Sequence, residues 1–196
     1  MAKLPPRKRV RDVELMRALS HPTRFALLGY LMATGAHTAS ECAAAVDSSP
    51  SNCSWHLRQL AQYGLVERSE TGDGRERPWQ AAQVGLDLGT LGSGDGALHG
   101  AQIGVAGAQL AEDRLLTQRF LDTADRLDPA WRDAAALTSY ALRVTPDELA
   151  ALREAVDTLI RPYVVGIRID APAAARPVHA SVRGFPRIEA DGNPAR

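Results

Sequence analysis

Several side chains that can read the edge of a base follow Pro50, at the start of a segment predicted to be helical as far as Tyr63. Asparagine, glutamine and arginine match the donor and acceptor pattern of adenine and guanine, and serines at a helix start lie beside free amides that suit a phosphate. These residues are candidate contacts to double-stranded DNA: Ser51, Asn52, Ser54, Trp55, His56, Arg58 and Gln59. The alternative is that they form only the solvated face of an amphipathic helix. For Trp55, contact with a base or sugar and packing in the core are both open.

Three arginines lie on or beside a predicted hairpin that follows this helix, with strands at 65–69 and 75–82 and a turn at 71–74. Arginines on such a wing contact backbone phosphates or enter the minor groove, where they add salt-sensitive affinity. The other reading is that they keep an edge strand soluble. The candidates are Arg68, Arg75 and Arg77. Trp79 is expected to pack the hairpin onto the helices rather than to touch DNA.

Positive charge is concentrated in the first part of the chain. Residues 1–82 contain 11 Lys+Arg and 8 Asp+Glu, whereas residues 83–196 contain 12 and 15. Five of the first eleven residues are basic, and this segment is predicted to be a flexible arm. Such an asymmetry makes the first part of the chain a candidate for binding an anionic polymer.

Metal and enzyme chemistry are not expected. Cys42 is the one cysteine of its predicted helix and has no second ligand nearby, and the five histidines show no ligand spacing. Cys42 is therefore predicted to be a small buried apolar residue. The glycine-rich run 92–96 lacks the Lys-Ser/Thr of a phosphate-binding loop. We expect no metal, no other cofactor and no catalytic site.

Four predicted helices must position the candidate contacts. Helix boundaries are indicated by caps and prolines: a helix over 12–19, one from Pro22 to 33, one opened by a Thr38–Glu41 capping box and ending at 46 or 47, and one from Pro50 to Tyr63. Gly64 supplies a left-handed stop. The third and fourth helices with the hairpin make a helix-turn-helix followed by a wing.

The segment 12–82 resembles the ArsR-type winged-helix repressors. The matching residues are His21-Pro22-Thr23-Arg24, then Ser54-x-His56-Leu57-x-x-Leu60, then Gly64-Leu65-Val66 and Gly74-Arg75-Glu76-Arg77-Pro78-Trp79. The resemblance implies a dimeric regulator that reads an operator through the fourth helix and the wing. Many relatives sense metals through paired cysteines in the third helix, and this chain departs from that pattern.

The remaining residues predict a helical region. The pattern indicates helices at 96–127, 128–142 and 145–163, and a short strand at 178–185. Glycine and alanine recur between 100 and 111, so either this stretch packs closely, as at a two-fold interface, or it is not helical before about residue 109. Apolar residues at near-helical spacing are the predicted dimer interface: Leu110, Leu116 and Phe120.

Aromatic residues in the same region have two readings. One interpretation is that these aromatic residues line a pocket for a small hydrophobic ligand. The other is that they form the ordinary core of a helical subdomain. The residues are Phe120, Trp131, Tyr140 and Tyr163. Nothing in the sequence separates a ligand-responsive regulator from a regulator or partner-binding protein whose C-terminal half only dimerises.

The predicted fold is mainly α with a small β-hairpin wing: an N-terminal winged helix-turn-helix plus a C-terminal helical dimerisation region with a short strand. The expected organisation is a basic arm at 1–11, a DNA-binding domain at 12–82, a glycine-rich linker at 83–95, a helical region at 96–186 and a tail at 187–196. No secretory signal or membrane span is expected, which predicts a cytoplasmic protein. The predicted function is that of a sequence-specific transcriptional regulator, a homodimeric repressor that binds an inverted-repeat operator.

Overall fold

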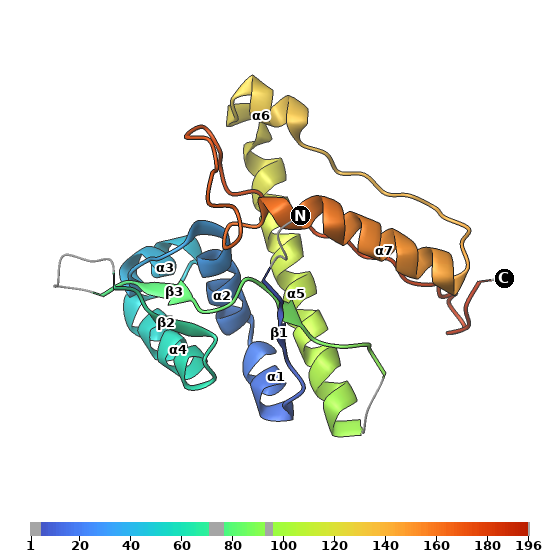
Figure 1. Ribbon diagram of the computed structural model, residues 1–196, viewed down its shortest axis with the longest axis horizontal. Coiled ribbons are helices and arrows are strands. Elements are labelled where there is room, and N and C mark those ends of the chain that lie inside the picture. Colours follow the sequence, from blue (N-terminus) through green and yellow to red (C-terminus); the bar gives the residue numbers. More distant parts are fainter. Residues whose placement is uncertain (1–4, 71–76, 93–95, 196) are drawn as a thin grey trace.

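The computed structural model describes residues 5–70, 77–92 and 96–195 of the chain. The elements are β1 (Lys8–Arg9), α1 (Val13–Leu19), α2 (Pro22–Thr34), α3 (Ala39–Ala45), α4 (Pro50–Gln62), β2 (Val66–Arg68), β3 (Trp79–Ala81), β4 (Leu86–Asp87), α5 (Gly96–Thr123), α6 (Pro129–Ala134) and α7 (Pro146–Ile160), with 3₁₀ turns at Ala124–Arg126 and Arg161–Tyr163. The fold is mainly helical, and β2 and β3 pair antiparallel as a small wing. The predicted fold class is confirmed (Figure 1).

Local signals set the helix boundaries of the winged-helix part. The Thr38 and Glu41 side chains form the predicted capping box at the start of α3. At the start of α4, the Ser49 hydroxyl accepts a hydrogen bond from the backbone N–H of Asn52 at 3.2 Å. Proline stands at the first turn of α2 and of α4. Gly64 follows α4 with φ +62°, a conformation that a glycine adopts without steric cost. These caps satisfy amides that the helix itself leaves free.

A single apolar core joins the winged helix to α5. Its most deeply buried large side chains come from α1, α2, α4 and the turn after α4, and Val105 of α5 is buried with them. They are Met16, Leu19, Leu27, Leu31, Leu57, Leu60 and Leu65. Figure 1 shows α5 running alongside α1 and α2. Gly104 lies so close to α1 that a Cβ atom built on it would be 2.9 Å from the Cβ of Ser20. The segment from residue 96 is thus helical, and one of its glycines permits close packing within the chain.

The N-terminal arm and the linker are not two independent loops. β1 and β4 pair in parallel, with the Lys8 amide on the Gly85 carbonyl and the Val10 amide on the Asp87 carbonyl, both at 2.9 Å. The Val10 side chain is fully buried. The prediction of a flexible arm over residues 1–11 is therefore wrong for 8–10, because an apolar residue in this segment enters the core.

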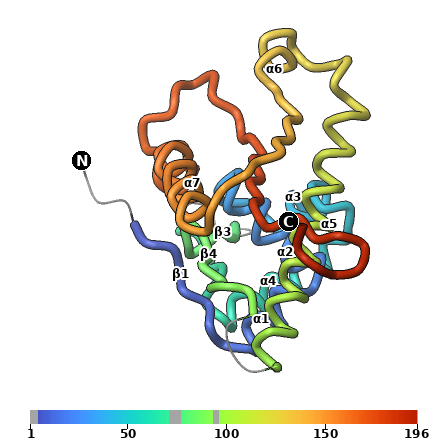
Figure 2. Tube along the Cα trace, turned by 90° about the vertical axis from the view of Figure 1, so that its right-hand side faces the viewer, coloured from blue at the N-terminus to red at the C-terminus, as the bar shows by residue number. Residues whose placement is uncertain are grey.

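The C-terminal region departs furthest from the prediction. Helix α6 ends at Ala134 instead of 142, and residues 135–145 are exposed and irregular. A short helix without a packing partner is marginal in water, which accounts for the early end. The helices α6 and α7 bury no residue completely. Figures 1 and 2 both place α6 at the far end of α5, away from α1–α4.

The strand predicted at 178–185 is also wrong. These residues have no strand partner and are held on α5 by side chains instead. The buried Asp113 carboxylate accepts hydrogen bonds from the Ser181 hydroxyl at 2.8 Å and from the Arg183 guanidinium at 2.5 Å, and it lies 3.0 Å from His179 Nε2. A buried carboxylate requires such partners, so Asp113 fixes this segment across α5.

Candidate nucleic-acid interface

The candidate contacts on α4 lie on the side of the helix that faces away from the core. Ser51, Asn52 and Arg58 are exposed, and Ser54 and Gln59 are half-exposed. The opposite side carries Cys53, Leu57 and Leu60, whose side chains are all fully buried. The helix is therefore amphipathic: its apolar side faces the core, and its polar side faces away from the core of the described structure. A free polar side is what a helix must present to enter the major groove.

Trp55 belongs to the outward side. Its side chain is 48% exposed, and its ring meets the His56 ring edge-on with a centroid distance of 4.8 Å. Of the two readings of this tryptophan, packing in the core is excluded. Its exposed indole near the start of α4 is available for an apolar contact with a ligand.

His56 does not belong to the outward side. Its side chain is 4% exposed, and its ring packs 4.5 Å from the ring of His21 at the start of α2. Burial lowers the pKa of His56, and the nearby His21 and Arg24 lower it further. The prediction that His56 contacts DNA is wrong. The spacing from Cys53, Leu57 and Leu60 puts it on the inner side, since residues three and four apart share a helix face.

Gln62 is a candidate that the sequence analysis missed. It is exposed and lies four residues after Arg58 and seven after Trp55 on α4. At 3.6 residues per turn these three side chains and that of Ser51 fall in one stripe along the helix. We refer to Ser51, Trp55, Arg58 and Gln62 as the α4 stripe. The same periodicity would have revealed Gln62 in the sequence.

Polar groups on α4 already hold one another in place. The Asn52 side-chain amide donates to the Ser48 hydroxyl at 2.9 Å, and Arg58 Nη1 donates to the Ser54 hydroxyl at 2.8 Å. Such contacts limit the rotamers of the Asn52 and Arg58 side chains before any ligand arrives. Less side-chain entropy is then lost when they bind a base edge.

The basic residues of the N-terminal arm support the fold rather than a free surface. The Lys8 ammonium donates to the carbonyls of Tyr63 and Gly64, each at 3.1 Å, at the C-terminal end of α4. A cation there also offsets the negative end of the helix dipole. Arg7 pairs with Asp157, and Arg11 pairs with Asp87 at 3.2 Å. Most of the described basic side chains of this arm are thus paired with groups of the same chain.

The wing carries two described arginines. The Arg68 guanidinium lies over the Trp79 ring, 3.8 Å from its centroid, and donates to the Arg77 carbonyl. Trp79 is 5% exposed and packs the hairpin onto the helices, as predicted, and its backbone pairs with His37. Arg77 is exposed. Arg75 lies outside the described residues.

The two cysteines are free and buried, which matches the prediction for Cys42. Burial raises the pKa of the Cys42 thiol to about 11 and raises that of Cys53. Thiols of this kind are protonated at neutral pH and are neither good nucleophiles nor good metal ligands. Among the described residues, no group of three or more metal-ligating side chains is present. None of the described helices has both the length and the apolar character needed to cross a bilayer.

The predicted dimer residues do not share a face of α5. Leu110 is 52% exposed, whereas Leu116 and Phe120 are half-buried. Leu110 and Leu116 are six residues apart, which turns their side chains about 120° from each other on a helix. Leu110 shares its face instead with two other exposed residues, Ile103 and Leu121, which are 51% and 52% exposed. The prediction of one seam through Leu110, Leu116 and Phe120 is therefore wrong.

Neither interpretation of the four aromatic residues, a hydrophobic pocket or the core of a helical subdomain, fits the described structure, because none of their side chains is buried. Tyr140 and Tyr163 are 79% and 66% exposed, and Trp131 lies under the Arg176 guanidinium, 5.4 Å from the ring centroid. Two cavities of about 330 and 320 Å³ lie beside α5, and neither is lined by these residues or by Phe120. The segments that carry these four residues, α5, α6, the irregular stretch 135–145 and the 3₁₀ turn Arg161–Tyr163, bury none of them in a common core.

Comparison with known proteins agrees with the geometry of the first part of the chain. Residues 19–69 match the model of a helix-turn-helix domain, which spans α2, α3, α4 and β2. This match supports a DNA-binding regulator. No curated protein matches the sequence at a significant level.

The chain also shows a weak likeness to solved structures. They include ZitR of Lactococcus lactis in complex with DNA (15% identity over 69% of this chain and 73% of that one, TM-score 0.28). A MarR family protein of Mycobacterium tuberculosis in complex with salicylic acid has 16% identity over 74% and 84%, with a TM-score of 0.30. MepR of Staphylococcus aureus, a regulator of a multidrug efflux pump, has 14% identity over 74% and 90%, with a TM-score of 0.29. Scores of this size do not establish a shared arrangement of the whole chain.

Proposed function

We propose that this chain is a sequence-specific DNA-binding transcriptional repressor that reads an operator through the outward side of α4. The observation that carries the proposal is the division of α4 into a fully buried apolar side and an exposed polar side, directly after α3 and before a wing. A helix-turn-helix places such a second helix in the major groove. The matched helix-turn-helix model over residues 19–69 supports the same reading.

The residues divide by the chemistry they offer to the groove. Asn52, Arg58 and Gln59 carry groups that pair with base edges, and Gln62 extends this set by one turn. Ser51 and Ser54 suit a phosphate near the start of the helix. Arg77 and Arg75 of the wing are proposed to contact the backbone, with Arg68 as support for the wing through Trp79.

The proposed active form is a homodimer that uses the outward face of α5. Ile103, Leu110 and Leu121 lie 7 and 11 residues apart, so they form one apolar line on that face. A single winged helix covers about 600–1,000 Å² of DNA contact, which is small for a specific regulator. Two copies related by a two-fold axis would read an inverted repeat with half-sites about one helical turn apart.

Selection from a random duplex library tests the proposal. The full chain is used to enrich binding sites, and the affinity for the enriched site is measured by fluorescence anisotropy at several salt concentrations. We expect an inverted repeat, and a plot of log affinity against log salt that falls by about 0.9 for each phosphate contacted. Absence of enrichment, together with no binding to any duplex at low salt, would refute the proposal.

A further inference from the structure

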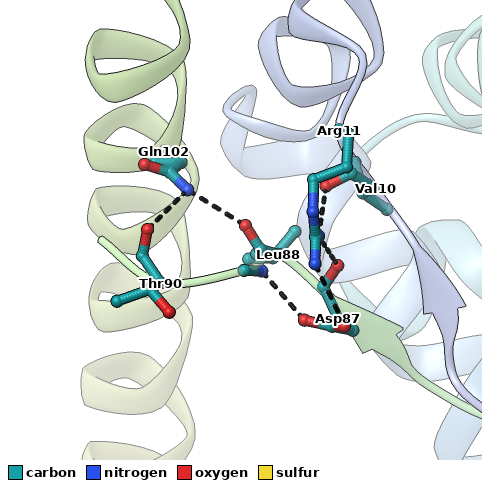
Figure 3. Close-up of polar contacts among 7 residues, drawn as sticks. Val10, Arg11, Asp87, Leu88, Thr90 and Gln102 are labelled. Atoms are coloured by element: carbon teal, nitrogen blue, oxygen red, sulfur yellow. Dashed lines mark hydrogen bonds and ion pairs between the residues drawn. The ribbon is translucent and has the colours of Figure 1, made fainter. Parts of the chain in front are cut away.

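A polar cavity lies where the N-terminal arm, the segment after β4, α5 and α7 meet. Its volume is about 330 Å³, and its lining includes Arg11, Asp87, Gly89, Leu98, Gln102 and Arg153. Figure 3 shows the polar contacts of Arg11 and Gln102, which lie on opposite sides of it. The size is in the range of small-molecule sites, which begin at about 300 Å³.

Arg11 is held rigidly at this cavity. Its Nη1 donates to the carbonyls of Val10 and Asp87, both at 2.8 Å, and its Nη2 pairs with the Asp87 carboxylate at 3.2 Å. Gly89 has φ +78°, and a Cβ atom there would lie 3.1 Å from the Arg11 Cζ. The glycine therefore allows the guanidinium to lie directly against the backbone.

Gln102 fixes the opposite wall. This α5 side chain is 2% exposed, and its amide nitrogen donates to the carbonyls of Leu88 and Thr90, each at 3.1 Å (Figure 3). The segment after β4 is thus tied to α5 from one side and to Arg11 from the other. A site with walls set in advance loses less entropy when a ligand binds.

The charges around the cavity are not balanced. The positive charge of Arg11 is offset by its ion pair with Asp87. Arg153 reaches the cavity from α7, and within the described part of the chain it has neither an ion-pair nor a hydrogen-bond partner. The lining consequently carries one net positive charge, on a side chain with five donors that are free to bind.

We propose that this cavity binds a small organic monocarboxylate, whose carboxylate pairs with the Arg153 guanidinium. A guanidinium and a carboxylate match as a two-pronged hydrogen-bonded pair, and Leu98 offers an apolar surface to the body of the ligand. A doubly charged phosphate fits less well, because the Asp87 carboxylate lies in the same lining. This ligand class differs from the small hydrophobic ligand that was one of the two alternatives left open by the sequence.

Bound here, the ligand contacts α7 through Arg153 and α5 through Leu98. In the structure α7 and the 3₁₀ turn after it reach the N-terminal arm through Asp157 on Arg7 and through Arg161, which donates to the Pro5 carbonyl. The ligand adds to these a contact between α7 and α5, so α7 is held at a further point. Occupancy should therefore slow amide hydrogen exchange over residues 146–160.

The test compares carboxylates with their uncharged amides on the full chain. Benzoate, 4-hydroxybenzoate and hexanoate are titrated to 10 mM, on the order of the weak affinities of small ligands, at constant ionic strength. Benzamide, 4-hydroxybenzamide, hexanamide and inorganic phosphate serve as controls. Thermal unfolding and hydrogen exchange are read out for the wild type, for Arg153→Gln, and for Arg143→Gln, a matched change at an exposed arginine outside the cavity.

At least one carboxylate should raise the unfolding temperature saturably and protect 146–160, whereas the amides and phosphate should not. Arg153→Gln should weaken this binding about tenfold or more, and Arg143→Gln should leave it unchanged. No saturable effect of any of the three acids, an equal effect of phosphate, or an equal effect in Arg153→Gln would overturn the proposal. The readouts involve no DNA, so failure here leaves the proposed DNA binding untouched, and the reverse also holds.

Discussion

Replacing Gly104 with alanine tests the closest contact between α5 and the winged-helix part. A Cβ at Gly104 would lie 2.9 Å from the Cβ of Ser20, which is a rigid position next to the backbone of α1. For Gly107, three residues along the same helix, no atom of the described residues lies within 4 Å of its Cβ position, apart from its own neighbours and helix backbone. The two glycines thus differ in surroundings while sharing a helical backbone, and they form a matched pair.

The expected change in the free energy of unfolding has a different sign at Gly107 and at Gly104. Glycine in a helix interior is about 1 kcal/mol less favourable than alanine, so Gly107→Ala should raise the free energy of unfolding by about that amount. At Gly104 the same gain is opposed by overpacking, which typically costs about 1–3 kcal/mol. Gly104→Ala should therefore range from neutral to about 2 kcal/mol destabilised.

Urea unfolding followed by circular dichroism measures both variants. The double variant Ser20→Gly/Gly104→Ala removes the opposing Cβ, so it should recover stability relative to the sum of the two single changes. If Gly104→Ala stabilises the protein as much as Gly107→Ala does, and Ser20→Gly shows no coupling to it, then α5 does not pack on α1 as described.

Three further predictions concern titration, assembly and metal. Burial lowers the pKa of His21 and His56 in the fold, so the unfolded chain binds more protons than the folded chain as the pH falls. The free energy of unfolding should therefore be highest above about pH 6.5, and it should decrease as the pH drops below this value. Urea unfolding between pH 7.5 and 5.5 should show this decrease, and a smaller decrease in His56→Gln. Leu110→Arg should shift the light-scattering mass from dimer to monomer at micromolar concentration, and a fully dimeric variant would place the interface elsewhere. Zinc should leave DNA affinity unchanged because the Cys42 thiol is buried and protonated, and zinc-dependent release of DNA that Cys42→Ser abolishes would contradict this.

The winged-helix part was predictable because its signals are local. Thr38 with Glu41, Pro22, Pro50 and Gly64 each determine a helix end through contacts with their immediate neighbours. Such contacts form within one turn and depend little on the rest of the chain.

Pairings between distant segments were not predictable in the same way. The β1–β4 ladder joins two residues of the arm to two of the linker, and strands this short leave no alternating pattern to read. The attachment of 178–185 to α5 depends on one buried carboxylate, Asp113. A helix over 135–142 is consistent with local propensity, but no packing face stabilises it there.

The errors on α4 and α5 have a different origin. The chemistry of His56 suits a base contact, but its spacing from Cys53 and Leu60 places it inside. Gln62 lies outside, as its spacing from Arg58 indicates. The near-helical spacing of Leu110, Leu116 and Phe120 predicts one seam, but the six-residue separation of Leu110 and Leu116 places these two on different faces. In each case the helical phase was available in the sequence.

The most direct test of the central claim is the discrimination that Arg58 gives between the selected operator and a scrambled duplex of equal length. If the α4 stripe reads bases, Arg58→Ala should reduce the ratio of the two affinities by about 5–150-fold, which corresponds to about 1–3 kcal/mol for a paired base contact. Arg143→Ala, the same change at an exposed arginine far along the chain from α4, should leave the ratio unchanged. Equal ratios for the wild type and Arg58→Ala, with Asn52→Ala and Gln62→Ala also without effect, would contradict the account, because the outward side of α4 would then not read sequence.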